Sequence, residues 1–112
     1  MRIAIPVTDG KLSAHFGHCE KFIIFDADEA GKKIIKEEVL IPPAHEPGLL
    51  PRWLAEQKAN VIIAGGMGQR AQDLFTQNDI KVEVGAAAKS PRQLVENYLN
   101  NELETGSNLC DH

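Results

Sequence analysis

Apolar and polar residues alternate along the first part of the chain. Ile3, Ile5 and Val7 recur with a period of two over residues 2–7, which predicts a strand with one face in the core. Residues 21–28 and 33–41 form two further apolar runs, and the turn sequence EAGK separates them. Because so short a connection joins these two runs, we expect them to pair as antiparallel strands.

A helical spacing replaces this alternation after the proline-rich segment 42–48. Leu50, Trp53 and Leu54 recur at helical spacing, and Pro51 is tolerated because it falls in the first turn. The elements predicted next are a strand at 60–64, a helix at about 69–77, a strand at 81–85 and a helix that begins at Pro91.

The last helix has the most distinct start signal. Ser90 and Gln93 form a capping box, and Pro91 occupies the first helical position. The resulting order, βββαβαβα, predicts an α/β domain with a mixed five-stranded sheet, helices on both faces and a hairpin at one edge. We expect residues 1–105 to form a single domain and residues 106–112 a flexible C-terminal tail.

Composition and charge narrow the class of protein. The chain is 43% hydrophobic and 25% charged, as in ordinary soluble globular domains. Its net charge of −4 argues against a nucleic-acid-binding module, because no basic field attracts phosphates. No apolar run reaches the roughly 20 residues that cross a bilayer, and the N-terminus is unlike a signal peptide. A cytoplasmic location follows, in which Cys19 and Cys110 are expected as free thiols.

The element order also predicts where a ligand would bind. In open α/β sheets, ligands lie beyond the carboxyl ends of parallel strands, where the chain order reverses. Three loops follow such ends here, at 8–20, 65–71 and 85–91. If the strands at 2–7 and 60–64 are neighbours, the first two loops face each other. Pro6 favours an opening there, because it removes one hydrogen bond from the strand ladder.

The second of these loops begins with the sequence GGMG, which comprises Gly65, Gly66, Met67 and Gly68. Glycines between a strand and a helix let the backbone approach a ligand, and the helix N-terminus favours negative charge. Arg70 lies in the first turn of that helix, where a cation is unfavourable unless an anion is near. The same glycines also suit a tight turn without a ligand, and they match no nucleotide-binding fingerprint.

Soft metal ligands are grouped in three segments of the chain. They are His15, His18 and Cys19 in the first loop, His45 before the first helix, and Cys110 and His112 in the tail. Imidazole and thiolate groups hold zinc, copper, iron and iron–sulfur clusters. The paired spacings of a closed zinc site are missing, so an open site with one or two side-chain ligands fits better. Each residue also has an ordinary structural interpretation, such as a small buried Cys19.

Four segments together resemble one known family. They are S-x-H-F-G at 13–17, F-I-I-F-D at 22–26, H-x-P-G-x-L-P-x-W-L at 45–54 and I-x-G-G-M-G-x-R-A at 63–71. In this order they resemble the dinitrogenase iron–molybdenum cofactor-binding family, whose members include nitrogenase accessory proteins. The resemblance extends from Arg2 to about Leu103.

The resemblance implies a ribonuclease-H-like three-layer fold and a carrier without catalytic activity. The cargo implied is an iron–molybdenum–sulfur cluster or a related metal–sulfur cluster, with cluster-biosynthesis or acceptor proteins as partners. His15 is implied as a direct ligand, while Arg70, Lys89 and the GGMG amides would face the anionic cluster. Nuclease activity is not implied, because no acidic cluster for two metal ions is present.

Two alternatives stay open from the sequence. His18 and Cys19 exceed the shared core of the family motif, so the chain could instead be a zinc- or copper-binding module that uses Cys19, Cys110 and nearby histidines. An enzyme acting on a small anion at GGMG is the third hypothesis, although no nucleophile elbow or positioned acid–base pair supports it.

Overall fold

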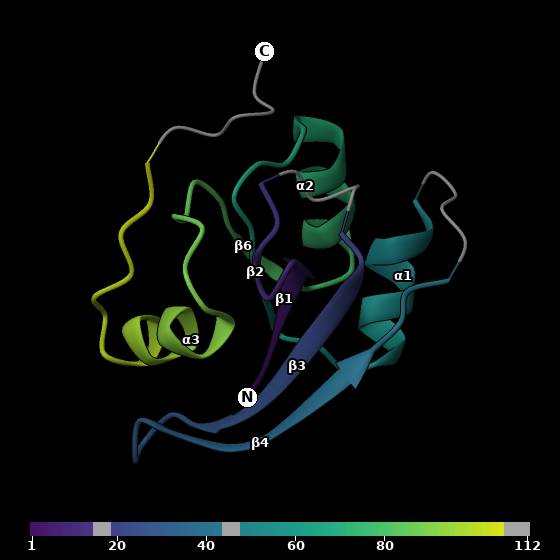
Figure 1. The fold of residues 1–112 in the computed structure, drawn as a ribbon. Coiled ribbons are helices and arrows are strands. Elements are labelled where there is room, and N and C mark those ends of the chain that lie inside the picture. Colours follow the sequence, from purple (N-terminus) through teal and green to yellow (C-terminus); the bar gives the residue numbers. More distant parts are fainter. Residues whose placement is uncertain (15–18, 44–47, 107–112) are drawn as a thin grey trace.

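The computed structural model describes residues 1–14, 19–43 and 48–106 (Figure 1). Its elements are, in order, β1 (Arg2–Thr8), β2 (Lys11–Leu12), β3 (Lys21–Asp28), β4 (Lys33–Leu40), α1 (Leu49–Glu56), β5 (Val61–Ile63), α2 (Gln69–Gln77), β6 (Lys81–Glu83) and α3 (Pro91–Leu99). None of these helices is long and apolar enough to cross a membrane.

The strands form one open, mixed sheet. Its order is β4-β3-β1-β5-β6, and β2 pairs with β1 outside this path. The β1–β3 and β3–β4 pairs are antiparallel, whereas β1–β5 and β5–β6 are parallel. The predicted mixed sheet and its edge hairpin are therefore confirmed. The predicted number of five strands is corrected, because the described sheet has six. The strand that the pattern missed is β2, whose two residues are too few to show an alternation.

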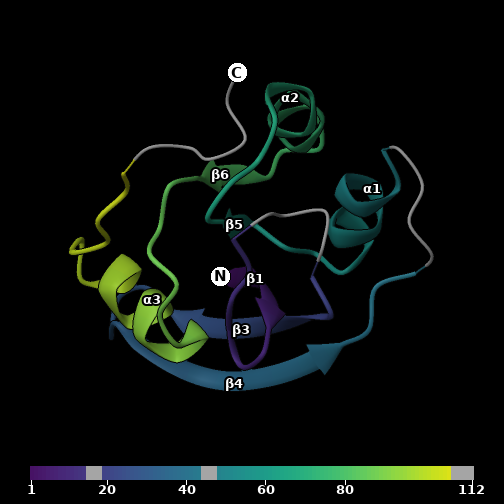
Figure 2. The same cartoon turned by 45° about the horizontal axis from the view of Figure 1, so that its top comes forward.

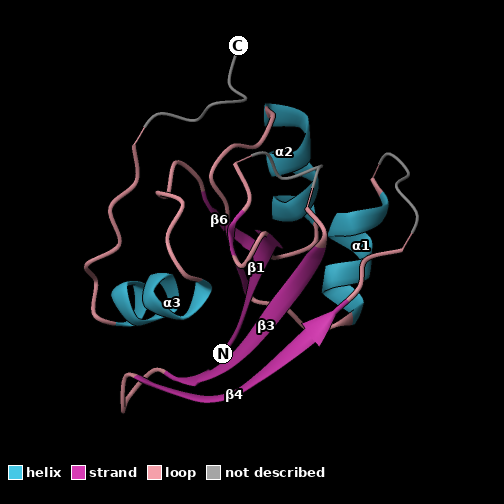
Figure 3. Cartoon of the chain, in the orientation of Figure 1, coloured by secondary structure: helices cyan, strands magenta, loops and turns pink. Residues whose placement is uncertain are grey.

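Helices cover both faces of the sheet, as predicted, and they divide the core in two (Figures 2 and 3). On one face, Ile3, Ile5 and Val7 of β1 pack with Leu94 and Val95 of α3. The side chains on the other face pack with α1 and α2, and they include Ala4, Phe22, Ile24, Leu54, Ile62 and Phe75. The alternation along β1 thus assigns successive side chains to different cores.

Candidate functional site

The ladder between β1 and β5 ends before β1 does. The last paired residues are Ala4 and Ile62, and Pro6, two positions later, has no amide hydrogen to donate. Farther along β1, Val7 pairs with Leu12 of β2. Since β3 pairs with the other edge of β1 at Val7, β2 takes the edge on which β5 pairs earlier in the strand. The structure confirms that β1 and β5 are neighbours, and it places the segment after β2 beside the segment after β5.

Gly65 is the point at which these two loops touch. A Cβ atom at this position would lie 3.0 Å from the carbonyl oxygen of Ser13 and 3.2 Å from that of Ala14. Both neighbours are backbone atoms, so they cannot move aside as a flexible side chain would. Only glycine fits at this contact without displacing the first loop. Ser13 and Ala14 were not among the predicted site residues, although Ser13 belongs to the S-x-H-F-G motif.

The third loop joins the other two through backbone hydrogen bonds. The N–H of Gly85 donates to the carbonyl oxygen of Gly65 (2.9 Å), and the N–H of Leu12 donates to that of Lys89 (3.2 Å). Gly85 has a φ of 85°, in the left-handed region that favours glycine. The three loops predicted at the carboxyl ends of the strands are therefore in contact with one another.

The first turn of α2 combines a cation with amides that lack a side-chain cap. Its N-cap residue is Gly68, which has no side chain to accept a hydrogen bond from the first-turn amides. Arg70 is exposed, and no acidic residue lies in the same turn. Within the described part of the chain, Arg70 has no ion-pair partner. A helix start of this kind is electrostatically suited to a bound anion.

Met67 and Gly66 are buried, whereas Arg70 is exposed. The side chain of Met67 is only 1% exposed and packs in the core under α1 and α2. Its carbonyl oxygen accepts a hydrogen bond from Nε2 of Gln72 (2.9 Å), which ties the loop to α2. Gly66 is buried as well. Any contact that these two residues make with a ligand would therefore involve the backbone.

Cys19 is half-buried against the core of α1 and α2. Burial raises the pKa of its thiol from the ordinary value of 9.0 to about 11, while a hydrogen bond with its own backbone acts in the opposite direction. At neutral pH the side chain is therefore a neutral thiol. A metal could bind it only by displacing the proton, which lowers the affinity that a preformed thiolate would give.

Five of the predicted metal ligands lie outside the described residues, namely His15, His18, His45, Cys110 and His112. Their predicted roles stay predictions. Within residues 1–14, 19–43 and 48–106, no group of three or more His, Cys, Asp or Glu side chains is arranged to hold a metal ion. The described residues thus supply backbone and charge to the candidate site, rather than a set of side-chain ligands.

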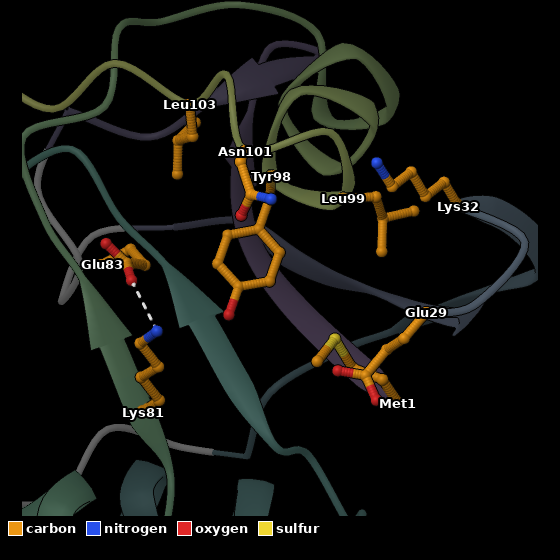
Figure 4. A pocket seen from close by; sticks show the side chains of 9 residues that line it. All are labelled: Met1, Glu29, Lys32, Lys81, Glu83, Tyr98, Leu99, Asn101 and Leu103. Carbon is orange, nitrogen blue, oxygen red and sulfur yellow. Dashed lines mark ion pairs between the residues drawn. The ribbon is translucent and has the colours of Figure 1, made fainter.

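A hollow of about 440 Å³ lies between β6 and the end of α3 (Figure 4). It is bordered by Met1 before β1, by Lys81 and Glu83 of β6, and by Tyr98 near the end of α3. Nζ of Lys81 lies 3.4 Å from Oε1 of Glu83 and 5.8 Å from the centre of the Tyr98 ring. Tyr98 and then Glu83 raise the pKa of Lys81. Because these polar groups already interact with each other, the hollow is a weaker candidate than the three loops.

The chain is similar to one known protein family and to several solved structures. Residues 1–101 match the family described as dinitrogenase iron–molybdenum cofactor. An uncharacterized protein of Methanocaldococcus jannaschii is 34% identical over 107 residues, which cover 93% of this chain and 90% of the relative. The crystal structure of PH0822 has a TM-score of 0.86 at 28% identity and covers 94% of both chains. The apo form of the orange protein from Desulfovibrio gigas has a TM-score of 0.72 at 24% identity, with 96% of this chain and 93% of that one covered.

Proposed function

The chain belongs to the dinitrogenase iron–molybdenum cofactor family, and from this premise we propose that it binds or carries a metal–sulfur cluster. The cargo proposed is an iron–molybdenum–sulfur cluster or a related iron–sulfur or heterometal cluster. The protein would act as an accessory or carrier, without catalysing a reaction, and would exchange the cluster with biosynthesis or acceptor proteins. The ribonuclease-H-like assignment is part of the same proposal, and the sheet order β4-β3-β1-β5-β6 supports it.

The contact between the three loops is the observation that carries this proposal. Gly65 packs directly against the backbone of Ser13 and Ala14, so the last described residues before His15 touch the loop that leads into α2. Metal–sulfur clusters are commonly anionic, and hydrogen bonds to their sulfur atoms help to hold them. The first-turn amides of α2 can provide such hydrogen bonds, and Arg70 can provide positive charge. Lys89, on the third loop, would add a second cation.

His15 is the residue that we propose as the direct ligand. His18, His45, Cys110 and His112 are proposed as further ligands. Cys19 is a weaker one, because its raised pKa makes the thiol proton harder for a metal to displace. The raised pKa would likewise weaken a zinc or copper module that uses Cys19, because the metal has to displace a more tightly held proton.

Anaerobic reconstitution tests the proposal. The purified chain would be incubated with iron, sulfide and molybdate, desalted, and then analysed for bound metal, acid-labile sulfide and visible absorption. We expect sulfide to be retained with iron or molybdenum, whereas a zinc or copper module would carry its own metal without acid-labile sulfide. The proposal fails if the protein takes up no cluster under these conditions.

Two variants and one control locate the cargo. His15→Ala should remove or alter the cluster absorption, because a direct ligand is lost. Arg70→Gln should lower cluster retention by about tenfold, because a cation near an anionic ligand contributes on the order of 1–2 kcal/mol. Arg52→Gln is the matched control, since Arg52 is an exposed arginine on α1. Equal cluster content and spectra in His15→Ala and the control would exclude the site proposed.

A further inference from the structure

Exposed apolar side chains gather on one strand at the edge of the sheet. Among the described residues, the large hydrophobic side chains that stay exposed are Ile35 (71%), Val39 (54%) and Ile41 (72%). The first two belong to β4, and Ile41 directly follows it. In the described sheet β4 pairs only with β3, so the hydrogen-bonding groups along its outer edge are available (Figure 2). An unpaired edge that carries exposed apolar side chains is a template for pairing with another strand.

Charged residues along β4 follow an order that is complementary to itself. Lys36 stands one residue before Glu37 and two before Glu38. In the pairing with β3, Lys36 is opposite Asp26 and Glu38 is opposite Ile24, so both side chains point to the face of α1 and α2. Glu37 is opposite Phe25 and points to the face of α3. When two copies of this strand pair antiparallel, Lys36 of one copy can therefore lie opposite an acidic residue of the other.

We propose that β4 pairs with β4 of a second copy of this chain, antiparallel and centred on Glu37. A two-fold axis at Glu37 places Lys36 of each copy directly opposite Glu38 of the other, which gives two equivalent ion pairs on one face. On the other face, Val39 lies two residues beyond the axis, so the partner strand covers part of its exposed side chain. The inference does not depend on the proposed cluster.

The central pair of Glu37 side chains is an unfavourable contact in this register, and α3 compensates for it. Nη1 of Arg92 lies 3.7 Å from Oε2 of Glu37 in each copy. Two arginines would therefore accompany the two glutamates at the axis. Without such cations, like charges directly opposite each other would destabilise the pair.

Neighbouring registers are less favourable than the one centred on Glu37. A pairing centred on Lys36 or on Glu38 places that residue opposite its own copy, and it loses both Lys36–Glu38 contacts. A pairing centred on Ile35 would fall on an irregular backbone, because the register with β3 shifts there and leaves Ile35 without a partner residue. Pro42 and Pro43 end the edge on the other side. The charged side chains of β4 disfavour pairing with unrelated strands, and they favour a second β4 in the register centred on Glu37.

The size of this contact predicts a reversible dimer. Stable interfaces bury about 800 Å² on each partner, and the pairing of a single eight-residue strand covers less than that. We therefore expect association that depends on protein concentration and weakens with salt, because its two ion pairs lie at the surface.

Sedimentation velocity on charge-reversed variants tests both the dimer and its register. Lys36→Glu gives acidic side chains at both 36 and 38, and Glu38→Lys gives basic side chains at both. Each variant alone should raise the dimer dissociation constant by about tenfold or more, because two attractions become two repulsions. An equimolar mixture of the two variants should restore dimers, since each acidic pair then faces a basic pair.

The mixture also controls for folding, because a misfolded variant could not restore association. Arg52→Glu carries the same change of charge as Lys36→Glu on α1, away from the edge, and should dimerise like the unmodified chain. Three results would overturn the proposal. The unmodified chain could stay monomeric at about 1 mM, which corresponds to a very weak association. Either single variant could dimerise as well as the control, or the mixture could stay monomeric.

Discussion

The thiol of Cys19 is half-buried beside the candidate site, and its reactivity follows from that burial. Loss of hydration disfavours the thiolate and raises the pKa to about 11. Because only the thiolate is nucleophilic, iodoacetamide should modify Cys19 roughly 100-fold more slowly at pH 8 than an accessible thiol. The rate should continue to rise up to about pH 11. A Cys110→Ser chain leaves Cys19 as the single thiol for mass spectrometry, and a plateau near pH 9 would contradict the assignment.

The same pKa makes a prediction about stability. A thiol whose pKa is higher in the folded than in the unfolded state stabilises the fold below about pH 9. That contribution is lost as the pH rises through about 11. In the Cys110→Ser background, Cys19→Ala should therefore reduce the fall in melting temperature between pH 9 and 11, as measured by circular dichroism. An unchanged pH dependence in the alanine variant would show that other groups cause the fall.

Gly65 offers a second test at the scale of one residue. In Gly65→Ala, the added Cβ would meet the carbonyl oxygens of Ser13 and Ala14 at 3.0 and 3.2 Å. We expect a loss of about 1–3 kcal/mol in the free energy of unfolding, or a displaced first loop, because the obstruction is backbone. Gly106→Ala is the matched control, since the described atom nearest to an added Cβ there is the carbonyl oxygen of Gly85, at an ordinary 3.7 Å. Urea denaturation of both variants compares them, and equal stabilities would contradict the contact.

Among the elements, α3 has a start that the sequence defines well. Ser90 is its N-cap, and the Ser90 side chain accepts a hydrogen bond from the N–H of Gln93 (3.3 Å). Ser90→Ala should lower the free energy of unfolding by about 0.5–1 kcal/mol, toward the small end of such caps because the bond is long. Ser90→Asp keeps an acceptor and should retain most of the stability in the same thermal melts. Equal losses in both variants would mean that the cap does not stabilise the helix.

Elements with a repeated pattern could be predicted from the sequence, and those without one could not. The strand at 21–28 and the helix at 69–77 coincide with β3 and α2, because the first is a continuous apolar run and the second repeats apolar residues at helical spacing. The strand predicted at 81–85 ends at Glu83 in the structure, since pairing with β5 stops there. The strand β2 exists because Pro6 and the departure of β5 leave one edge of β1 open. This cause lies in the tertiary structure, so the local sequence pattern could not predict β2.

The candidate site was predictable to a similar extent. Strand order and the glycines of GGMG indicated correctly which loops would meet. The sequence did not show that Met67 would turn into the core, because alternation does not apply in a loop. Nor could it show the high pKa of Cys19, which depends on residues of the packed core around it. The ligand roles of His15 and His18 stay predictions.

At the scale of the whole molecule, the two cores share one sheet. Along β1, Ile3 and Ile5 face α3 while Ala4 between them faces α1 and α2. If β1 loses its packing against one core, its side chains in the other core are therefore displaced as well. The chain should accordingly unfold in a single cooperative transition, despite helices that lie on opposite faces (Figure 1).

Trp53 makes this coupling measurable, because it is the single tryptophan of the chain. It packs on the side of α1 and α2, with its ring centre 5.7 Å from that of Phe22. Leu94→Ala removes a buried side chain from the opposite face and should cost about 2–5 kcal/mol. If the sheet couples the two cores, Leu94→Ala lowers the unfolding midpoint reported by Trp53 fluorescence as far as the one reported by circular dichroism. Leu54→Ala, in the core beside Trp53, is the matched control, and both of its signals should shift together as well. A Trp53 midpoint that responds to Leu54→Ala but ignores Leu94→Ala would show that the two faces unfold independently.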